Sequence, residues 1–265
     1  MWTFLKRRAA QFVRLRRAPT AKNKRNDSFE QFKQNNPGAS FAQYYVWQAK
    51  QTIAGGNAHT TLGLRLCEQP GQTEETDYFE AGRAAFNRYQ KFCGLVATDR
   101  VVDYGCGSLR LGIHFIEFLD AANYFGLDVT RDFIDIGVSA APALITQKRP
   151  QLFAIDDISI RSAVAFGADA VISNAVSYHV HPDETGAYLD NLRAICAKPG
   201  ARLFFDVKLS DSTVRFRSRG WAYPLDMYIA GLKPLTFVKQ HRTSVVRDYP
   251  EVPNMRSTVL EFRRD

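Results

Sequence analysis

Short apolar runs and longer segments with helical spacing alternate along the chain from residue 100 onward. The short runs are rich in β-branched and aromatic residues and predict buried strands, and the longer segments predict amphipathic helices. Such alternation predicts an α/β protein whose mostly parallel sheet has helices on both faces, and the last two apolar runs predict a C-terminal antiparallel hairpin. The predicted strands are 100–104, 124–128, 152–155, 168–173, 202–207, 235–240 and 257–263, and the predicted helices are 109–119, 130–140, 183–197 and 225–232.

The segment before the sheet is less regular. Aromatic residues at helical spacing predict one helix at 76–95 and a shorter one at 41–53. Proline, glycine and asparagine predict a linker at 18–40 and a loop at 54–73. The expected organisation is a basic amphipathic tail, a linker with a helical and loop extension, and a main domain, at residues 1–26, 27–75 and 76–265.

The composition is that of a globular protein with a sizeable core. The chain has 265 residues, of which 45% are hydrophobic and 23% charged. It has no apolar run near the roughly 18 residues that a membrane span requires. The cysteines are scattered without Cys-x-x-Cys spacing, which predicts reduced thiols in a cytoplasmic protein and no metal site. They are Cys67, Cys93, Cys106 and Cys196.

The net charge of +8 belongs to the N-terminal tail. Residues 1–26 hold nine basic residues and no acidic ones, whereas the rest of the chain has 26 basic and 27 acidic residues. A nearly neutral main domain argues against a broad phosphate-binding face. Residues 1–17 predict a helix of moderate amphipathicity that contacts an anionic membrane surface. An organelle-targeting peptide and a solvated tail are the alternatives.

One strand runs into a glycine turn with an acidic residue in front of it. The order is Asp103-x-Gly105-x-Gly107, followed by a helical pattern, and the next predicted strand ends at Asp128, 21 residues after Gly107. A strand, a glycine turn and a helix N-terminus form the usual binding element for a nucleotide-like ligand in open α/β folds. The dinucleotide fingerprint would need glycine at position 110, where the chain has Arg110.

This arrangement resembles motif I of the class I S-adenosylmethionine-dependent methyltransferases, a family with a Rossmann-like, seven-stranded, mostly parallel sheet and a C-terminal antiparallel hairpin. The resemblance covers about residues 76–263. Many members of the family have a third glycine where this chain has Leu109. The cofactor that the resemblance implies is S-adenosyl-L-methionine.

The resemblance also implies roles for individual residues. Asp103 and the turn would meet the methionine end of the cofactor, Asp128 would bind its ribose, and Asp156 or the neighbouring Asp157 would meet its adenine. Asn174, after the fourth predicted strand, would be a further contact. The alternatives are a helix-capping role for Asp103 and ordinary turn roles for the other acids. The implied cofactor-binding set is Asp103, Gly105, Cys106, Gly107, Asp128, Asp156 and Asn174.

The segment 176–180 resembles a pattern found in small-molecule and sugar methyltransferases, with His179 at its histidine. This resemblance implies that His179 is the catalytic base for a hydroxyl acceptor. A structural histidine and a metal ligand shared with His181 are the alternatives. Arg83, on the helix before the first strand, is a candidate for the cofactor carboxylate, and Trp221, Tyr223 and Tyr228 are candidates for stacking on an acceptor.

The predicted function is therefore O-methylation of a small molecule, a sugar or a lipid-linked glycan by a cytoplasmic enzyme that the tail can hold at a membrane. Nucleic acid is not the expected partner, because the segment after the fourth strand lacks the N/D-P-P-Y signature of nucleobase amine methyltransferases. The alternatives are an RNA methyltransferase that uses the basic tail, a dinucleotide oxidoreductase and a non-catalytic cofactor-binding protein.

Overall fold

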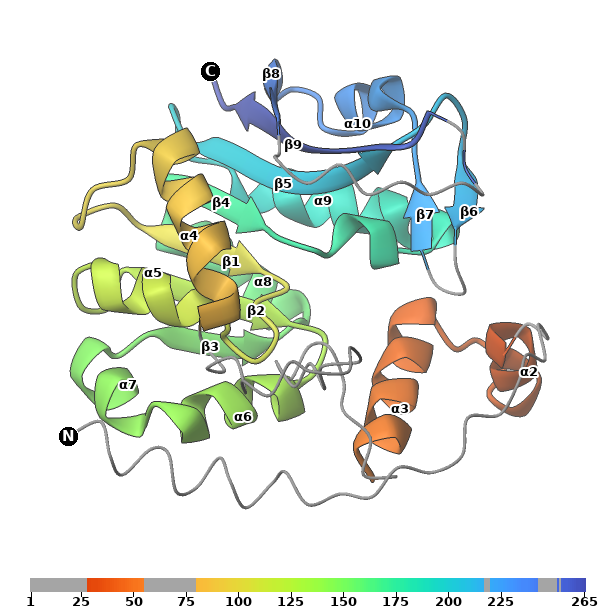
Figure 1. Cartoon of the computed structure of the whole chain (residues 1–265), viewed down its shortest axis with the longest axis horizontal. Helices are drawn as coiled ribbons and strands as arrows, with labels where there is room; N and C mark the ends of the chain where they lie inside the picture. The colour runs from red at the N-terminus through yellow and green to blue at the C-terminus, as the bar shows by residue number, and fades with distance from the viewer. Residues whose placement is uncertain (1–27, 55–79, 217–219, 243–251, 253) are drawn as a thin grey trace, which may run out of the picture.

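A seven-stranded sheet forms the centre of the molecule (Figure 1). The computed structural model describes residues 28–54, 80–216, 220–242, 252 and 254–265. The strand order is β3-β2-β1-β4-β5-β9-β8, in which the first five strands are parallel and the last two are antiparallel to their neighbours. The strands are β1 (Val101–Tyr104), β2 (Tyr124–Asp128), β3 (Gln151–Ala154), β4 (Ala170–Ser173), β5 (Arg202–Leu209), β8 (Thr236–Arg242) and β9 (Arg256–Arg263).

Helices cover both faces of this sheet. Side chains of α4 (Glu80–Cys93), α5 (Gly112–Phe118), α6 (Arg131–Ala140) and α7 (Pro142–Lys148) join one apolar core. Side chains of α8 (Asp157–Phe166), α9 (Thr185–Ile195) and α10 (Leu225–Gly231) join the other. Two short strands, β6 (Val214–Phe216) and β7 (Gly220–Ala222), pair separately. Two 3₁₀ turns, η2 (Ser177–His179) and η3 (Pro182–Glu184), connect β4 to α9.

The predicted fold is confirmed, because the sheet has the expected parallel strands and antiparallel hairpin. The central strand β1 is buried along its whole length, which explains why it appears in the sequence as an apolar run with one acid. The sequence interpretation missed α7, α8 and the pair β6–β7. Among the described residues no helix is long and apolar enough to cross a membrane.

The prediction of a linker is wrong over residues 28–35, which form the helix α2 (Ser28–Asn35). Phe29 is buried against Phe41 and Tyr44 of the next helix, α3 (Phe41–Ala54), at ring-centroid distances of 5.0 and 5.4 Å. These aromatic contacts stabilise a helix whose own length is marginal. The tail at 1–26 and most of the predicted loop at 54–73 lie outside the described residues.

Candidate active site

The glycine turn lies at the carboxyl end of β1, where open α/β folds bind their ligands. The backbone N–H groups of Gly105 and Cys106 both donate to the carbonyl of Leu127 on β2, at 2.7 and 2.9 Å. Gly105 has a φ of +84°, and a Cβ on it would stand 2.2 Å from Cγ2 of Val176. The turn therefore requires glycine at this position and packs against the loop that follows β4.

Asp128 is bound directly to the turn. Its carboxylate accepts a hydrogen bond of 2.7 Å from the N–H of Gly107, and its residue surface is 6% exposed. Burial raises the pKa of Asp128 to about 6, although backbone hydrogen bonds from Gly107, Thr130 and Val129 act in the opposite direction. The structure thus joins Gly107 and Asp128, which the sequence interpretation assigned to the same cofactor.

Asp103 lies under the turn, on the side of the sheet that α4 and α5 cover. Its carboxylate accepts a hydrogen bond of 2.8 Å from the hydroxyl of Tyr124. Burial raises the pKa of Asp103 to about 7, and the hydrogen bond from Tyr124 partly opposes this shift. The observed partner of Asp103 is therefore a neighbouring strand, and its contact with a cofactor remains a prediction.

Leu109 occupies the position where many family members have a third glycine, and it keeps a left-handed backbone with a φ of +60°. This conformation costs a residue with a side chain about 1–2 kcal/mol. The side chain is fully buried, and its atoms lie against the backbone positions of Gly112 on α5 and Gly137 on α6. Leu109 therefore packs between helices and offsets its backbone cost by burial.

Two other predicted cofactor residues lie at the same edge of the sheet. Asp156 is exposed and forms a capping box with Ser159 at the start of α8, and the backbone hydrogen bond from Ser159 lowers the pKa of its carboxyl group. Asn174 follows β4, and its side-chain oxygen accepts a hydrogen bond of 3.2 Å from the hydroxyl of Tyr89 on α4. Their roles toward a cofactor remain predictions.

Exposed apolar side chains lie next to two of these acids. Val129, directly after Asp128, is 40% exposed, and Ile158, two residues after Asp156, is 67% exposed. They follow β2 and β3, which are neighbours in the sheet. The sequence interpretation missed both, although an apolar residue next to a strand-end acid was visible.

His179 lies half-buried on η2 between two tyrosines. Its ring centroid is 4.5 Å from that of Tyr178 and 5.8 Å from that of Tyr45 on α3. The ring of His181 packs elsewhere, against Phe41 and Trp221 at 5.5 and 5.1 Å. No group of three metal-binding side chains occurs among the described residues.

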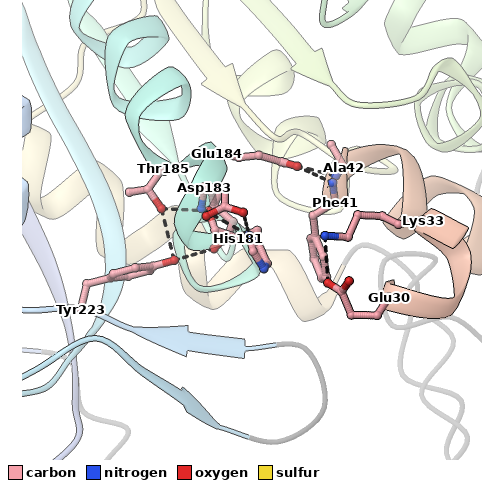
Figure 2. A network of polar contacts seen from close by, with 10 residues as sticks. Glu30, Lys33, Phe41, Ala42, His181, Asp183, Glu184, Thr185 and Tyr223 are labelled. Atoms are coloured by element: carbon pink, nitrogen blue, oxygen red, sulfur yellow. Dashed lines mark hydrogen bonds and ion pairs between the residues drawn. The ribbon is translucent and has the colours of Figure 1, made fainter. Parts of the chain in front are cut away.

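The helix α3 is anchored to the site at both ends. At its start, the Glu184 carboxylate on η3 accepts hydrogen bonds from the N–H groups of Phe41 and Ala42 (Figure 2). Near its end, Lys50 forms a salt bridge of 2.9 Å with Asp132 on α6. Because η3 follows β4, α6 follows β2 and β1 lies between these strands, α3 crosses over the carboxyl end of β1. Its two ends are therefore held on either side of β1 at this edge of the sheet.

The aromatic residues proposed for acceptor stacking pack against other parts of the protein. Trp221 packs edge-on against Phe41 at 4.9 Å. Tyr223 donates a hydrogen bond of 2.7 Å to the carbonyl of Val180, and Tyr228 is buried in the core. Their observed contacts are with other protein side chains and backbone.

Asp206, which the sequence interpretation did not single out, holds the loop after β4. Its carboxylate accepts a hydrogen bond from the N–H of Ala175, which has a φ of +61°. Its carbonyl accepts a hydrogen bond of 2.6 Å from Ser177. An aspartate between the apolar residues Phe205 and Val207 of β5 was the signal that could have found it.

No protein-family model matches the sequence, and no curated protein matches it either. Solved structures match it in fold. The [4+2]-cyclase SpnF matches with a TM-score of 0.57 and 14% identity, over 86% of this chain and 98% of that one. Magnesium protoporphyrin IX methyltransferase (ChlM) from Synechocystis PCC 6803, with bound SAM, matches with a TM-score of 0.50 and 14% identity, over 93% of this chain and 100% of that one.

A third match is the glycopeptide N-methyltransferase MtfA complexed with sinefungin, with a TM-score of 0.50 and 12% identity, over 69% of this chain and 94% of that one. The chain therefore has the fold of the class I S-adenosylmethionine-dependent methyltransferases. At these identities the likeness establishes the fold and leaves the reaction open, and one of the matched proteins is named a cyclase.

Proposed function

We propose that this protein is an S-adenosylmethionine-dependent methyltransferase that methylates a hydroxyl group of a small molecule, a sugar or a lipid-linked glycan. The observation that supports it most is the hydrogen bond between Gly107 and Asp128, which sets a buried carboxylate at the end of β2 beside the glycine turn. This arrangement of donor and acceptor groups fits the cofactor, because a carboxylate there accepts hydrogen bonds from ribose hydroxyls.

The chain's own groups would hold the cofactor along the carboxyl ends of β1, β2 and β3. Asp128 would bind the ribose, and the exposed side chains of Val129 and Ile158 offer apolar surface to a flat base. Leu109 does not argue against binding, because its side chain packs between α5 and α6. When bound, the cofactor would supply the methyl group of its sulfonium. The neutral thioether that remains is the leaving group, and it needs no acid.

His179 would accept the proton of the acceptor hydroxyl. It follows β4, it is half-buried, and the rings of Tyr45 and Tyr178 lie beside it. A base contributes most when it is positioned within hydrogen-bonding reach of the proton that it removes. The helix α3 at this edge of the sheet would limit the access of water to the site.

The tail adds a proposal about location. Residues 1–17 would hold a cytoplasmic enzyme at an anionic membrane, which suits a lipid-linked acceptor. Each basic residue near such a surface contributes about 1 kcal/mol. Binding of the full-length chain and of a chain without residues 1–26 to phosphatidylserine vesicles tests this part separately.

The experiment that tests the proposed function is calorimetric titration with S-adenosylhomocysteine, with NAD as the control ligand. Micromolar binding of S-adenosylhomocysteine alone supports the cofactor assignment. A screen of glycan and lipid extracts with a labelled methyl donor then tests transfer. Binding of NAD alone would contradict the proposal, and cofactor binding without transfer to any extract would favour a non-catalytic or cyclase-like role.

A further inference from the structure

A hollow of about 530 Å³ lies between the N-terminal helices α2 and α3, at one side of the molecule (Figure 1). None of the residues that line it belongs to the glycine turn or to a strand end, so this α2–α3 hollow is separate from the candidate cofactor site. The lining consists of Ser28, Gln31, Phe32, Asn35, Asn36 and Trp47.

The aromatic part of the lining is held in place and still exposed. The indole of Trp47 stacks on the ring of Tyr44, with centroids 6.1 Å apart and an angle of 26° between the ring planes. The ring of Phe32 lies 5.2 Å from the same indole. Trp47 nevertheless remains 45% exposed. A ligand that stacks on it would therefore meet a ring that is already ordered, which lowers the entropic cost of binding.

The polar part of the lining is uncharged. Gln31 and Asn35 lie one helical turn apart on the same side of α2 and are exposed. Within the described parts of the chain, neither side chain forms a hydrogen bond. The two charged residues of α2, Glu30 and Lys33, pair with each other at 2.9 Å (Figure 2). Since an amide side chain both donates and accepts hydrogen bonds, the hollow offers both kinds of group to a neutral ligand.

This lining selects one class of ligand. An anion or a cation would find no opposite charge in it, and an acyl chain would bury the amides of Gln31 and Asn35 without partners. A sugar ring fits both parts, because it has an apolar C–H face for an aromatic ring and a rim of hydroxyls that donate and accept hydrogen bonds.

We propose that the α2–α3 hollow binds an uncharged glycan, with one sugar ring stacked on Trp47 and its hydroxyls hydrogen-bonded to Gln31 and Asn35. Tyr45, on the opposite side of α3 from Trp47, lies beside His179 with ring centroids 5.8 Å apart. A glycan of several rings is long enough to cross a helix roughly 10–12 Å wide and present a hydroxyl to His179. The choice of a glycan as the acceptor rests on the proposed function.

Titration of the full-length chain with four neutral hexasaccharides tests the site, namely maltohexaose, cellohexaose, chitohexaose and mannohexaose. Calorimetry measures the affinity, and tryptophan fluorescence reports contact with an indole. At least one of the four is expected to bind. Trp47→Ala should then weaken it about tenfold or more, as is typical of a tryptophan at the centre of an interface.

The exposed amides provide variants that leave the aromatic packing intact. Gln31→Ala and Asn35→Ala should each weaken the bound hexasaccharide about threefold, through the loss of a hydrogen bond. Gln34→Ala removes an exposed glutamine of the same helix that does not line the hollow, and it should leave the affinity unchanged. Thermal denaturation establishes that each variant folds, and Trp47→Phe, which keeps a smaller ring, should give an intermediate loss.

Two results would overturn the inference. One is that none of the four hexasaccharides binds the wild-type chain, and the other is binding that does not change in Trp47→Ala, Gln31→Ala or Asn35→Ala. If no sugar binds and Trp47→Ala instead lowers binding to phosphatidylserine vesicles, the α2–α3 hollow contacts a membrane and the inference is wrong.

Failure of this inference differs from failure of the proposed function, because the sugar titration is made without a cofactor. A chain that binds a hexasaccharide through Trp47 and does not bind S-adenosylhomocysteine keeps the glycan site and contradicts the proposed function. A chain that binds S-adenosylhomocysteine and none of the sugars loses the glycan site, and a small molecule is then the favoured acceptor.

Discussion

The N–H of Gly107 and the carboxylate of Asp128 are joined by a hydrogen bond of 2.7 Å across 21 residues of chain. This bond connects the glycine turn after β1 to the end of β2. A change at either residue therefore alters the shape of the turn as well as a possible ligand contact. Variants that keep the bond and variants that remove it separate these two effects.

Replacing Asp128 tests its role toward the ribose. Asp128→Ala removes the acceptor of the Gly107 N–H and the charge, and it is expected to weaken S-adenosylhomocysteine by about 1.5–3 kcal/mol, the scale of a charged hydrogen bond. Asp128→Asn keeps an oxygen for the turn and is expected to lose less. Calorimetry at pH 8, where the carboxyl is ionised, measures both. Equal affinity of the wild-type protein and both variants for S-adenosylhomocysteine would show that Asp128 does not bind the cofactor.

The close contact between Gly105 and Val176 predicts a coupled pair of substitutions. Gly105→Ala places a Cβ 2.2 Å from Cγ2 of Val176 and adds a left-handed alanine at a φ of +84°. The expected loss of unfolding free energy is about 2–4 kcal/mol, from overpacking and backbone strain together. Adding Val176→Ala to Gly105→Ala should recover the free energy lost to overpacking. The loss that comes from backbone strain should remain. Urea denaturation of the double-mutant cycle checks this, and simple additivity would contradict the contact.

The buried Asp103 predicts that stability falls as the pH rises. Its pKa in the folded protein is about 7 against the ordinary 3.8 of an aspartate, so the folded state binds the proton more tightly. Unfolding free energy is then lost as the pH rises through the range between these values. The loss is on the order of 2–4 kcal/mol. Asp103→Asn still accepts from Tyr124 and should flatten this dependence in urea denaturation at pH 5 and pH 8; an unchanged slope would assign it to other groups.

His179 is expected to affect turnover and not cofactor binding. His179→Ala should lower the rate of methyl transfer by about 10²-fold, the lower scale for a general base. Single-turnover transfer of a labelled methyl group, with the acceptor found by the extract screen, measures this. S-adenosylhomocysteine affinity is the internal control. Undiminished transfer would leave His179 as a side chain that packs between Tyr45 and Tyr178.

The Glu184 carboxylate caps α3, and its removal is expected to lower stability. Glu184→Ala leaves the N–H groups of Phe41 and Ala42 without their partner, and a loss of about 1–2 kcal/mol is expected. Glu184→Gln keeps one acceptor oxygen and should lose less. Glu117→Ala, an exposed acid on α5, is the control. Chemical denaturation measures all three, and equal losses would mean that the cap does not stabilise the docked helix.

Much of the sheet could be predicted because each strand is short, apolar and bounded by turn residues. The end of β2 at Asp128 and the turn at Gly105 were visible for this reason. The helix α2 could not be predicted from its own eight residues, because its stability comes from Phe29 packing on α3. Local patterns do not show contacts of this kind.

In the candidate site, too, some features could be predicted from sequence spacing and others depend on contacts between distant residues. The glycine turn and Asp128 are signalled by spacing, since a parallel sheet brings successive strand ends to one edge. The position of α3 depends on a contact between Phe41 and Glu184, which are 143 residues apart.

The Glu184 carboxylate, which caps α3, is synthesised long after the helix that it caps. The ribosome completes α3 well before it reaches Glu184, and 143 residues take about 7–30 s to translate at ordinary rates. During that interval the aromatic face of α3 has neither its cap nor the Trp221 side chain to pack against. The N-terminal helices are therefore made before the residues that hold α3 in place.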